Sequence, residues 1–125
     1  MKRGNLYDQH GGSLAGPGEL VEELYGRGTL RVVRIHSEGH RTPAGSWYDQ
    51  EEDEWVALLA GRADLRFEDG TVITLAPGDW VLIPAHARHR VERTSTSPRA
   101  LWLAVHLGFP GPLDRRTGRE DAGLP

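Results

Sequence analysis

The sequence predicts an all-β fold of antiparallel strands, and three features carry that prediction. Short segments rich in Val, Leu, Ile and Trp recur between residues 29 and 107, separated by turn signals roughly every eight to twelve residues. Two turn signals, Asp69-Gly70 and Pro77-Gly78-Asp79, join consecutive segments as hairpins. The sequence has no sustained helical periodicity, and only ELVEEL, from Glu19, is compatible with a helical turn. In one small domain, a jelly roll or closed barrel best protects the strand edges.

Six strands are expected from their content of β-branched, aliphatic and aromatic residues. In chain order they are TLRVVRIHS (29–37), WVALLAG (55–61), RADLRF (62–67), TVITLA (71–76), DWVLIPA (79–85) and RALWLAVHL (99–107). Asp69-Gly70 predicts a type I′ turn, because both central residues of that turn need a positive φ. At the next turn Pro77 fixes its own φ and Gly78 supplies the conformation that other residues avoid.

Length, charge and cysteine content limit the class of protein. The chain has 125 residues, a common size for one domain with a proper core. It has no cysteine, which excludes disulfides, zinc-thiolate sites and thiol catalysis. Its net charge is -3 and its basic residues are scattered, so no nucleic-acid partner is expected. With no apolar run long enough to span a bilayer and no signal peptide, we expect no membrane partner and a cytoplasmic location.

One domain over residues 19–109 is expected, with a tail at each end. Residues 1–18 are rich in glycine and lack periodicity, which predicts a flexible N-terminal segment. Residues 110–125 have the same character and predict a disordered C-terminal tail.

Two stretches of the chain resemble the signature motifs of the cupin family. The second half of the first motif, G(X)5HXH(X)3,4E(X)6G, matches Glu54 through Gly61. The second motif, G(X)5PXG(X)2H(X)3N, matches at Gly78, Pro84 and His89, with His86 in place of its glycine and Arg93 in place of its asparagine. The resemblance covers roughly Leu30 to Leu107. It implies the antiparallel double-stranded β-helix, or jelly-roll barrel, of small RmlC-like cupins.

The chain departs from the family at the two histidines of the first motif. With three residues between the second histidine position and Glu54, the two positions are occupied by Tyr48 and Gln50. With four residues between them, they are occupied by Trp47 and Asp49. We prefer the first spacing, because Tyr48 and Gln50 then share one face of a strand and residues 51–53 form a polar turn. An amide oxygen and a phenol are weaker ligands for a divalent ion than two imidazoles.

The resemblance implies that Tyr48, Gln50, Glu54 and His89 converge in one pocket inside the barrel. Val91 and Leu58 are expected in its apolar wall. If the pocket holds a divalent transition metal (Fe, Mn, Ni or Zn), the candidate ligands are His89, Glu54, His86, Gln50 and His106. His89 and Glu54 with either His86 or His106 would give the two-His-one-carboxylate composition of mononuclear iron enzymes. His89 as a hydrogen-bonded interior histidine, and His86 as a turn residue near the surface, need no metal.

Two functions remain open on the sequence. The first is a small cupin whose pocket binds a small polar ligand, such as a sugar or a carboxylic acid, with a degenerate or weak metal site. The alternative is a metal-dependent enzyme of the dioxygenase or isomerase type with His89 and Glu54 as ligands. Whether there is turnover, and which residues would be catalytic, stays open. The family resemblance further implies a homodimer that pairs through the segment from Glu19 to Ile35.

Overall fold

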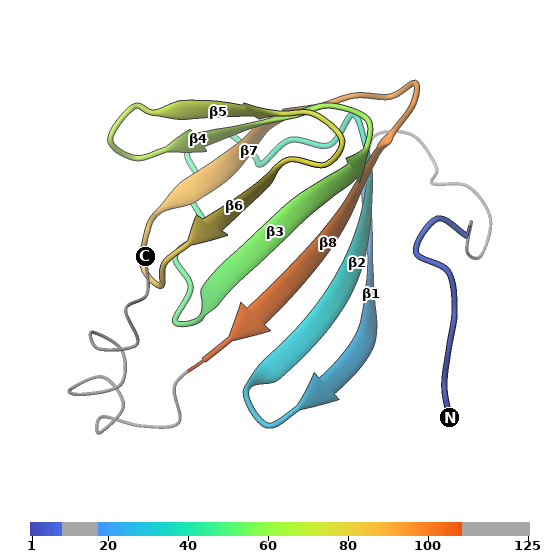
Figure 1. Cartoon of the computed structure of the whole chain (residues 1–125). Helices are drawn as coiled ribbons and strands as arrows, with labels where there is room; N and C mark the ends of the chain where they lie inside the picture. Colours follow the sequence, from blue (N-terminus) through green and yellow to red (C-terminus); the bar gives the residue numbers. More distant parts are fainter. Residues whose placement is uncertain (9–17, 109–125) are drawn as a thin grey trace.

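Figure 1 shows the computed structural model of the chain, which describes residues 1–8 and 18–108. The predicted C-terminal tail (110–125) and half of the predicted N-terminal segment (residues 9–17) lie outside the described residues. The strands are β1 (Gly18–Arg27), β2 (Leu30–Glu38), β3 (Asp53–Ala60), β4 (Ala63–Phe67), β5 (Val72–Leu75), β6 (Trp80–Ile83), β7 (His89–Thr94) and β8 (Ala100–Leu107). The described part of the chain contains no helix long and apolar enough to cross a membrane. The predicted all-β fold is confirmed.

The strands form two antiparallel sheets that face each other as a jelly roll. The larger sheet has the order β1-β2-β8-β3-β6 and the smaller one has the order β5-β4-β7. The last strand, β8, lies between β2 and β3, so segments far apart in the sequence are hydrogen-bonded neighbours. This strand order places residues from both motifs around the interior of the same barrel.

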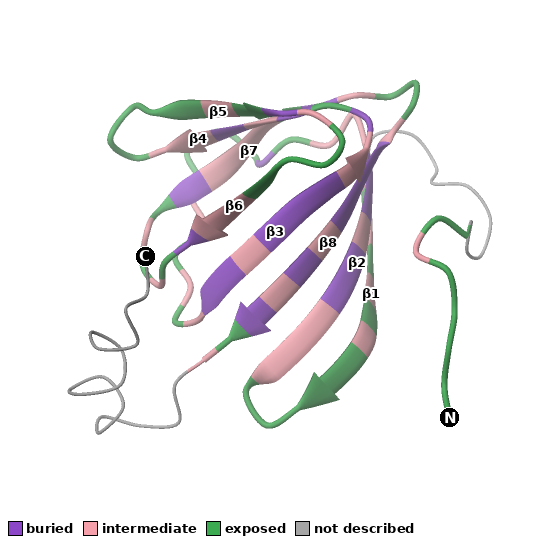
Figure 2. Ribbon diagram, viewed as in Figure 1, coloured by how far each residue is buried: buried purple, intermediate pink, exposed green. Residues whose placement is uncertain are grey.

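The core lies between the sheets and is densest along β3 and β8 (Figure 2). In their antiparallel register Val56 is opposite Ala104 and Leu58 is opposite Trp102, and all four are buried. Successive side chains of a strand point to opposite faces, so these alternate residues form one apolar layer inside the barrel. Complete burial of one such aliphatic side chain contributes about 1.5–3 kcal/mol to stability.

Two of the eight strands were not predicted. The segment from Glu19 is part of β1, so the helical turn that ELVEEL allowed is wrong. Its residues alternate between partly buried and exposed because they pair with β2, and three glutamates obscure this pattern in the sequence. The second strand, β7, has only one apolar residue, Val91, among its six, and was not among the strands expected from the sequence. Pairing with β4, rather than local apolar content, holds it in an extended conformation.

The hairpin between β4 and β5 is confirmed, but the predicted type I′ turn is wrong. Gly70 has a φ of 97°, whereas Asp69 is not among the described non-glycine residues with a positive φ. The Gly70 N–H donates to the Phe67 carbonyl (2.9 Å), and the Phe67 N–H donates to the Thr71 carbonyl (2.8 Å). These bonds define a three-residue loop, in which a type I turn is followed by a left-handed glycine. The Asp69 carboxylate accepts a bond from the Thr71 N–H (2.9 Å), which stabilises this form of the turn.

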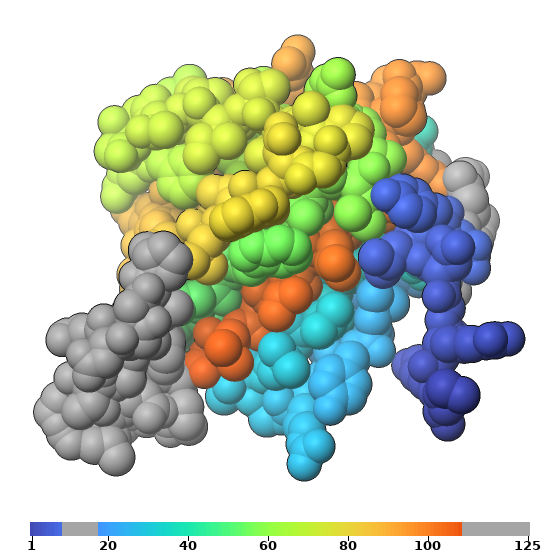
Figure 3. Space-filling model, viewed as in Figure 1, coloured from blue at the N-terminus to red at the C-terminus, as the bar shows by residue number. Residues whose placement is uncertain are grey.

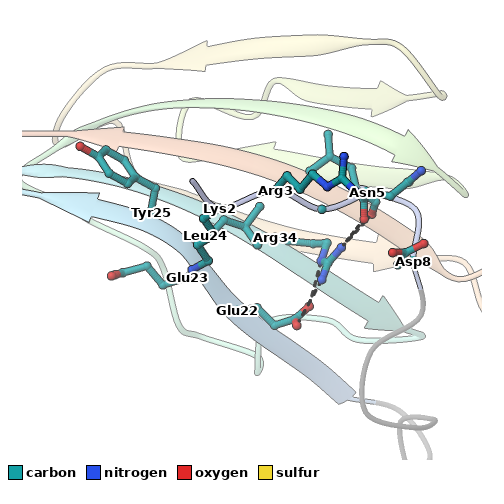
Figure 4. A pocket seen from close by; sticks show the side chains of 11 residues that line it. Lys2, Arg3, Asn5, Asp8, Glu22, Glu23, Leu24, Tyr25 and Arg34 are labelled. Atoms are coloured by element: carbon teal, nitrogen blue, oxygen red, sulfur yellow. Dashed lines mark hydrogen bonds and ion pairs between the residues drawn. The ribbon is translucent and has the colours of Figure 1, made fainter.

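The first eight residues lie against the outside of β1 and β2 (Figures 3 and 4). Arg34 of β2 holds this segment in place. Its side chain points out of the barrel, whereas the residues on either side of it point in. Arg34 is 2% exposed, and its guanidinium pairs with both oxygens of Glu22 (2.9 and 3.3 Å) and donates to the carbonyls of Asn5 (3.0 Å) and Leu6 (3.1 Å). A cavity of about 640 Å³ lies under this segment. Because Arg34 has its partners within the chain, we place the candidate site elsewhere, inside the barrel.

Candidate ligand pocket

A cavity of about 230 Å³ opens into the barrel between the two sheets. Its apolar wall includes Val33, Val56, Leu65, Val91 and Trp102, which come from five different strands. Leu58, which was expected in this wall, lies in the core and is not among the residues that line the cavity. The volume is roughly that of seven or eight liquid waters at about 30 Å³ each, so the space suits a small molecule.

Glu54 and His106 are brought together by the register of β3 and β8. The two residues are directly opposite each other in the antiparallel pair, on the face that also carries Val56 and Trp102. Both line the cavity and both are buried, with exposed fractions of 8% and 6%. Oε2 of Glu54 is 3.8 Å from Nε2 of His106. On the other side of the ring, Nδ1 is 3.6 Å from Oε1 of Glu52 and has no hydrogen-bond partner among the described residues.

His89 reaches the same carboxylate from the smaller sheet. Its Nδ1 is 2.8 Å from the Ala87 carbonyl, to which it donates, so Nε2 is left facing the cavity. Nε2 is 3.7 Å from Oε1 of Glu54. Burial by itself lowers the pKa of the His89 imidazole, but the Glu54 carboxylate and the Ala87 carbonyl outweigh burial and leave this pKa raised. The Glu54 carboxylate and the Ala87 carbonyl therefore both favour the protonated form of His89.

Tyr48 and Gln50 also line the cavity, although the expected strand around them is wrong. Tyr48 forms only an isolated bridge with His89: its N–H donates to the His89 carbonyl (2.7 Å), and its carbonyl accepts from the His89 N–H (3.1 Å). The centres of their two rings are 5.5 Å apart. Burial, and then the carboxylates of Glu19 and Glu54, raise the pKa of the Tyr48 phenol. The phenol therefore stays protonated and can donate to a bound molecule.

His86 is not brought to the cavity. Its side chain is 60% exposed, and its Nδ1 lies 2.7 Å from Oδ1 of Asp49 at the surface. Its φ of 66° is left-handed, which explains why the family motif has glycine at this position. Of the two histidines that the sequence left as alternatives, His106 is the one that lines the cavity.

Trp47 and Asp49, which a spacing of four would have put in the pocket, are not among the lining residues either. The Trp47 ring lies 6.0 Å from the guanidinium carbons of both Arg88 and Arg90. Asp49 pairs with His86 as described above. Their neighbours Tyr48 and Gln50 are the residues that face the interior.

Two charged residues of the cavity, Arg31 and Glu19, were missed by the sequence motifs. Arg31 alternates with Val33 and Ile35 on the inner face of β2, and the spacing of those apolar residues was the available signal. Its guanidinium is partly exposed and lies 3.5 Å from Oε1 of Glu52. Glu19 belongs to β1, whose extended conformation was not predicted.

A metal ion is the cofactor that the family motifs imply, and the geometry shows whether these residues fit one. His89 faces Oε1 of Glu54 and His106 faces Oε2, so the two imidazoles approach different oxygens rather than one common point. Within residues 1–8 and 18–108, no group of three or more His, Cys, Asp or Glu side chains is placed to hold an ion. As placed, the three side chains do not fit a metal cage, and no step below is routed through a metal.

Comparison with known proteins agrees with the motifs. The model of the Cupin_2 family, a cupin domain, matches residues 28–106. The crystal structure of a protein from Ralstonia eutropha JMP134, provisionally named a mannose-6-phosphate isomerase, is similar with a TM-score of 0.79. The two chains are 38% identical, and the similarity covers 86% of this chain and 99% of that one. Curated proteins gave no match.

Two more distant structures share the fold. One is a cupin superfamily protein from Desulfitobacterium hafniense DCB-2, with a TM-score of 0.66, 20% identity and coverage of 78% of this chain and 84% of that one. The other is an RmlC-like cupin protein from Desulfovibrio desulfuricans, with a TM-score of 0.67, 18% identity and coverage of 86% and 96%. Since the family model spans more than half of the chain and the Ralstonia protein resembles it over nearly its whole length, this chain belongs to the cupin family.

Proposed function

We propose that the protein binds a small polar ligand inside its barrel. The observation that carries the proposal is the buried carboxylate of Glu54, which faces a cavity of about 230 Å³. The two imidazoles that face it, those of His89 and His106, are 3.7 and 3.8 Å away, beyond the length of a direct hydrogen bond. A buried carboxylate that lacks direct hydrogen bonds is destabilising, and the O–H or N–H groups of a ligand would supply them.

The other lining groups support a ligand with a polar end and a compact carbon body. Tyr48 and Gln50 add a donor and an amide to the lining around Glu54, and aliphatic side chains and Trp102 make up its apolar part. The name of the Ralstonia relative makes sugars and sugar phosphates the first compounds to test. The same name favours isomerisation as a second candidate function, which would use this cavity. A cytoplasmic location, permitted by a chain without cysteine, is part of this proposal.

We also propose that the protein is a homodimer. β1 is an edge strand of the larger sheet, and an edge with apolar side chains is a template for pairing with another chain. Val21 and Tyr25 of β1 are both more than half exposed, at 56% and 51%. A two-fold pairing of β1 with its copy would cover both residues.

Ligand binding is tested by titrating the chelator-treated protein with sugars, sugar phosphates and hydroxy acids, followed by NMR and calorimetry. A ligand of the cavity should shift the resonances of Val56, Val91 and Trp102. The Glu54→Gln variant should bind it about tenfold or more weakly, because a hydrogen bond to a charged group contributes about 1.5–3 kcal/mol. The matched control is Glu51→Gln, which removes an exposed carboxylate three residues away and should bind like wild type. Shifts confined to residues outside the cavity, or equal binding by Glu54→Gln, would refute the proposal.

A further inference from the structure

The two carboxylate oxygens of Glu54 lie at nearly equal distances from two different imidazoles. Oε1 is 3.7 Å from Nε2 of His89, and Oε2 is 3.8 Å from Nε2 of His106. A direct N–H···O bond spans about 2.7–3.2 Å, so both gaps are too long for one. Each gap is nevertheless short enough for a single oxygen atom to lie within hydrogen-bond distance of both side chains. Each oxygen of the carboxylate thus faces one imidazole nitrogen across a gap of similar length.

We propose that the ligand of this cavity is a vicinal diol, whose two hydroxyls each bridge one oxygen of Glu54 and the facing imidazole. The proposal rests on the proposed function and names the chemical class of the ligand. A hydroxyl suits each gap because it both donates and accepts: it donates its proton to the carboxylate and accepts from an imidazole N–H. The two oxygens of one carboxylate are held close together in one plane. Hydroxyls bound to them are therefore neighbours too, as they are on adjacent carbons.

The surroundings of each imidazole fit this arrangement. On the His89 side, Nδ1 is committed to the Ala87 carbonyl, so Nε2 is the ring atom that faces the gap. On the other side, β3 and β8 hold His106 directly opposite Glu54, so the second gap is set by main-chain pairing rather than by a mobile loop.

Other ligand classes fit less well. A carboxylic acid in its ionised form would bring a second negative charge against the buried Glu54 carboxylate. A single hydroxyl or an ammonium group would occupy one gap and leave the other open. A diol carried on a small aliphatic ring satisfies both gaps and presents carbon atoms to Val33, Val56 and Val91. Its size also suits a cavity of about 230 Å³.

The test compares four small compounds on the wild-type protein in a buffer with excess chelator. The probes are cis-1,2-cyclohexanediol, its monomethyl ether, cis-1,3-cyclohexanediol and cyclohexanol, with affinities measured by NMR titration. The 1,2-diol should bind about tenfold or more tightly than each of the others, since each of them loses one bridge to a charged group. Equal affinities for the 1,2-diol and cyclohexanol would overturn the proposal.

Variants then show whether the preference for the 1,2-diol depends on the bridges between Glu54 and the two imidazoles. Glu54→Gln and His106→Phe should each lower the affinity for the 1,2-diol to that for cyclohexanol, while Glu51→Gln should keep the preference. If either variant does not fold, the comparison of probes on the wild type still decides. A diol that binds only after zinc or iron is added would also overturn the proposal, because a metal would then make the contact. If a different polar compound binds in a Glu54-dependent way without preference for diols, the diol inference fails and the proposed function stands. If no compound enters the cavity, both fail.

Discussion

Glu54 on β3 lies directly opposite His106 on β8, and the facing atoms of the two side chains are 3.8 Å apart. Both side chains are buried, and ionisable side chains are rarely buried unless they are paired, so the register brings together two groups that each need a polar partner. The family motif contributes Glu54 and His89, whereas the second imidazole comes from a strand outside the motif. The pairing of β3 with β8 therefore completes the polar end of the cavity.

The stability of the protein should depend on His89 in the mildly acidic to neutral range. Because the pKa of His89 is raised in the folded protein, protonation favours folding. This stabilisation is present below the unfolded pKa of about 6.5 and is lost as the pH rises through the higher folded pKa. Urea unfolding of wild type and His89→Gln, at pH values on both sides of this range, should show a smaller difference at the higher pH. A difference that grows with pH would contradict the prediction.

His36 should have the opposite effect. Burial lowers the pKa of its imidazole, helped by the charges of Arg34 and Arg99 and opposed by the Glu22 carboxylate. A lowered pKa means that protonation disfavours the folded state, so stability should fall as the pH drops below about 6.5 towards the folded pKa. His36→Gln should remove this loss on acidification. The same urea curves measure it, and an unchanged acid response in the variant would refute it.

His86 occupies a left-handed position, and glycine should be the better residue there for stability. At a φ of 66° a side chain costs about 1–2 kcal/mol relative to glycine. The exposed pair with Asp49 offsets only about 0–1 kcal/mol of this. We expect His86→Gly to be at least as stable as wild type, and about 1 kcal/mol more stable than the control His86→Ala, which keeps the strain and loses the pair. Thermal unfolding measures this order; equal stability of the glycine and alanine variants would show that the loop is not strained.

Two added imidazoles should give the cavity a high metal affinity. Tyr48 and Gln50 line the cavity with Glu54 and His89, and the family motif has histidines at the positions that we assign to them. Tyr48→His with Gln50→His should therefore bind zinc or nickel orders of magnitude more tightly than wild type. Further replacement of Glu54 by Gln should abolish the gain.

Calorimetric titration of chelator-stripped proteins measures that affinity, and elemental analysis of the wild type, purified without a chelating column, provides the baseline. We expect the wild type to carry much less than one equivalent of transition metal. Unchanged affinity in a folded double variant would mean that the two positions are not those of the family histidines. About one equivalent of metal in the wild type would instead favour the metal-dependent enzyme.

The dimer should depend on the exposed apolar residues of β1. Sedimentation at micromolar concentration should give the mass of a dimer for wild type. Tyr25→Glu should shift the mass towards the monomer, because a charge at an exposed strand edge disfavours pairing. The control is Val72→Glu, which alters an exposed apolar residue of the smaller sheet and should remain dimeric. A wild type that sediments as a monomer would end this proposal.

By itself, the sequence was sufficient for the fold class and for four polar residues that line the cavity, Tyr48, Gln50, Glu54 and His89. Turn signals such as Pro77-Gly78 and the apolar content of β3 and β8 are local properties, so they can be recognised from the sequence alone. The motif spacings from Glu54 to Gly61 and from Gly78 to His89 are likewise properties of the sequence alone. These features predicted the jelly roll and a cupin barrel, and the fold and family are confirmed.

Tertiary structure decided the rest. β1 and β7 are extended because they pair with β2 and β4, and their charged residues carry little local signal for a strand. The choice between His86 and His106 depended on the β3–β8 register and on a left-handed turn, neither of which a motif records. Arg31 and Glu19 reach the cavity only because β1 and β2 close that side of the barrel. Spacing along a chain reports neighbours within a strand, whereas the distances around Glu54 are set between strands that are far apart in sequence.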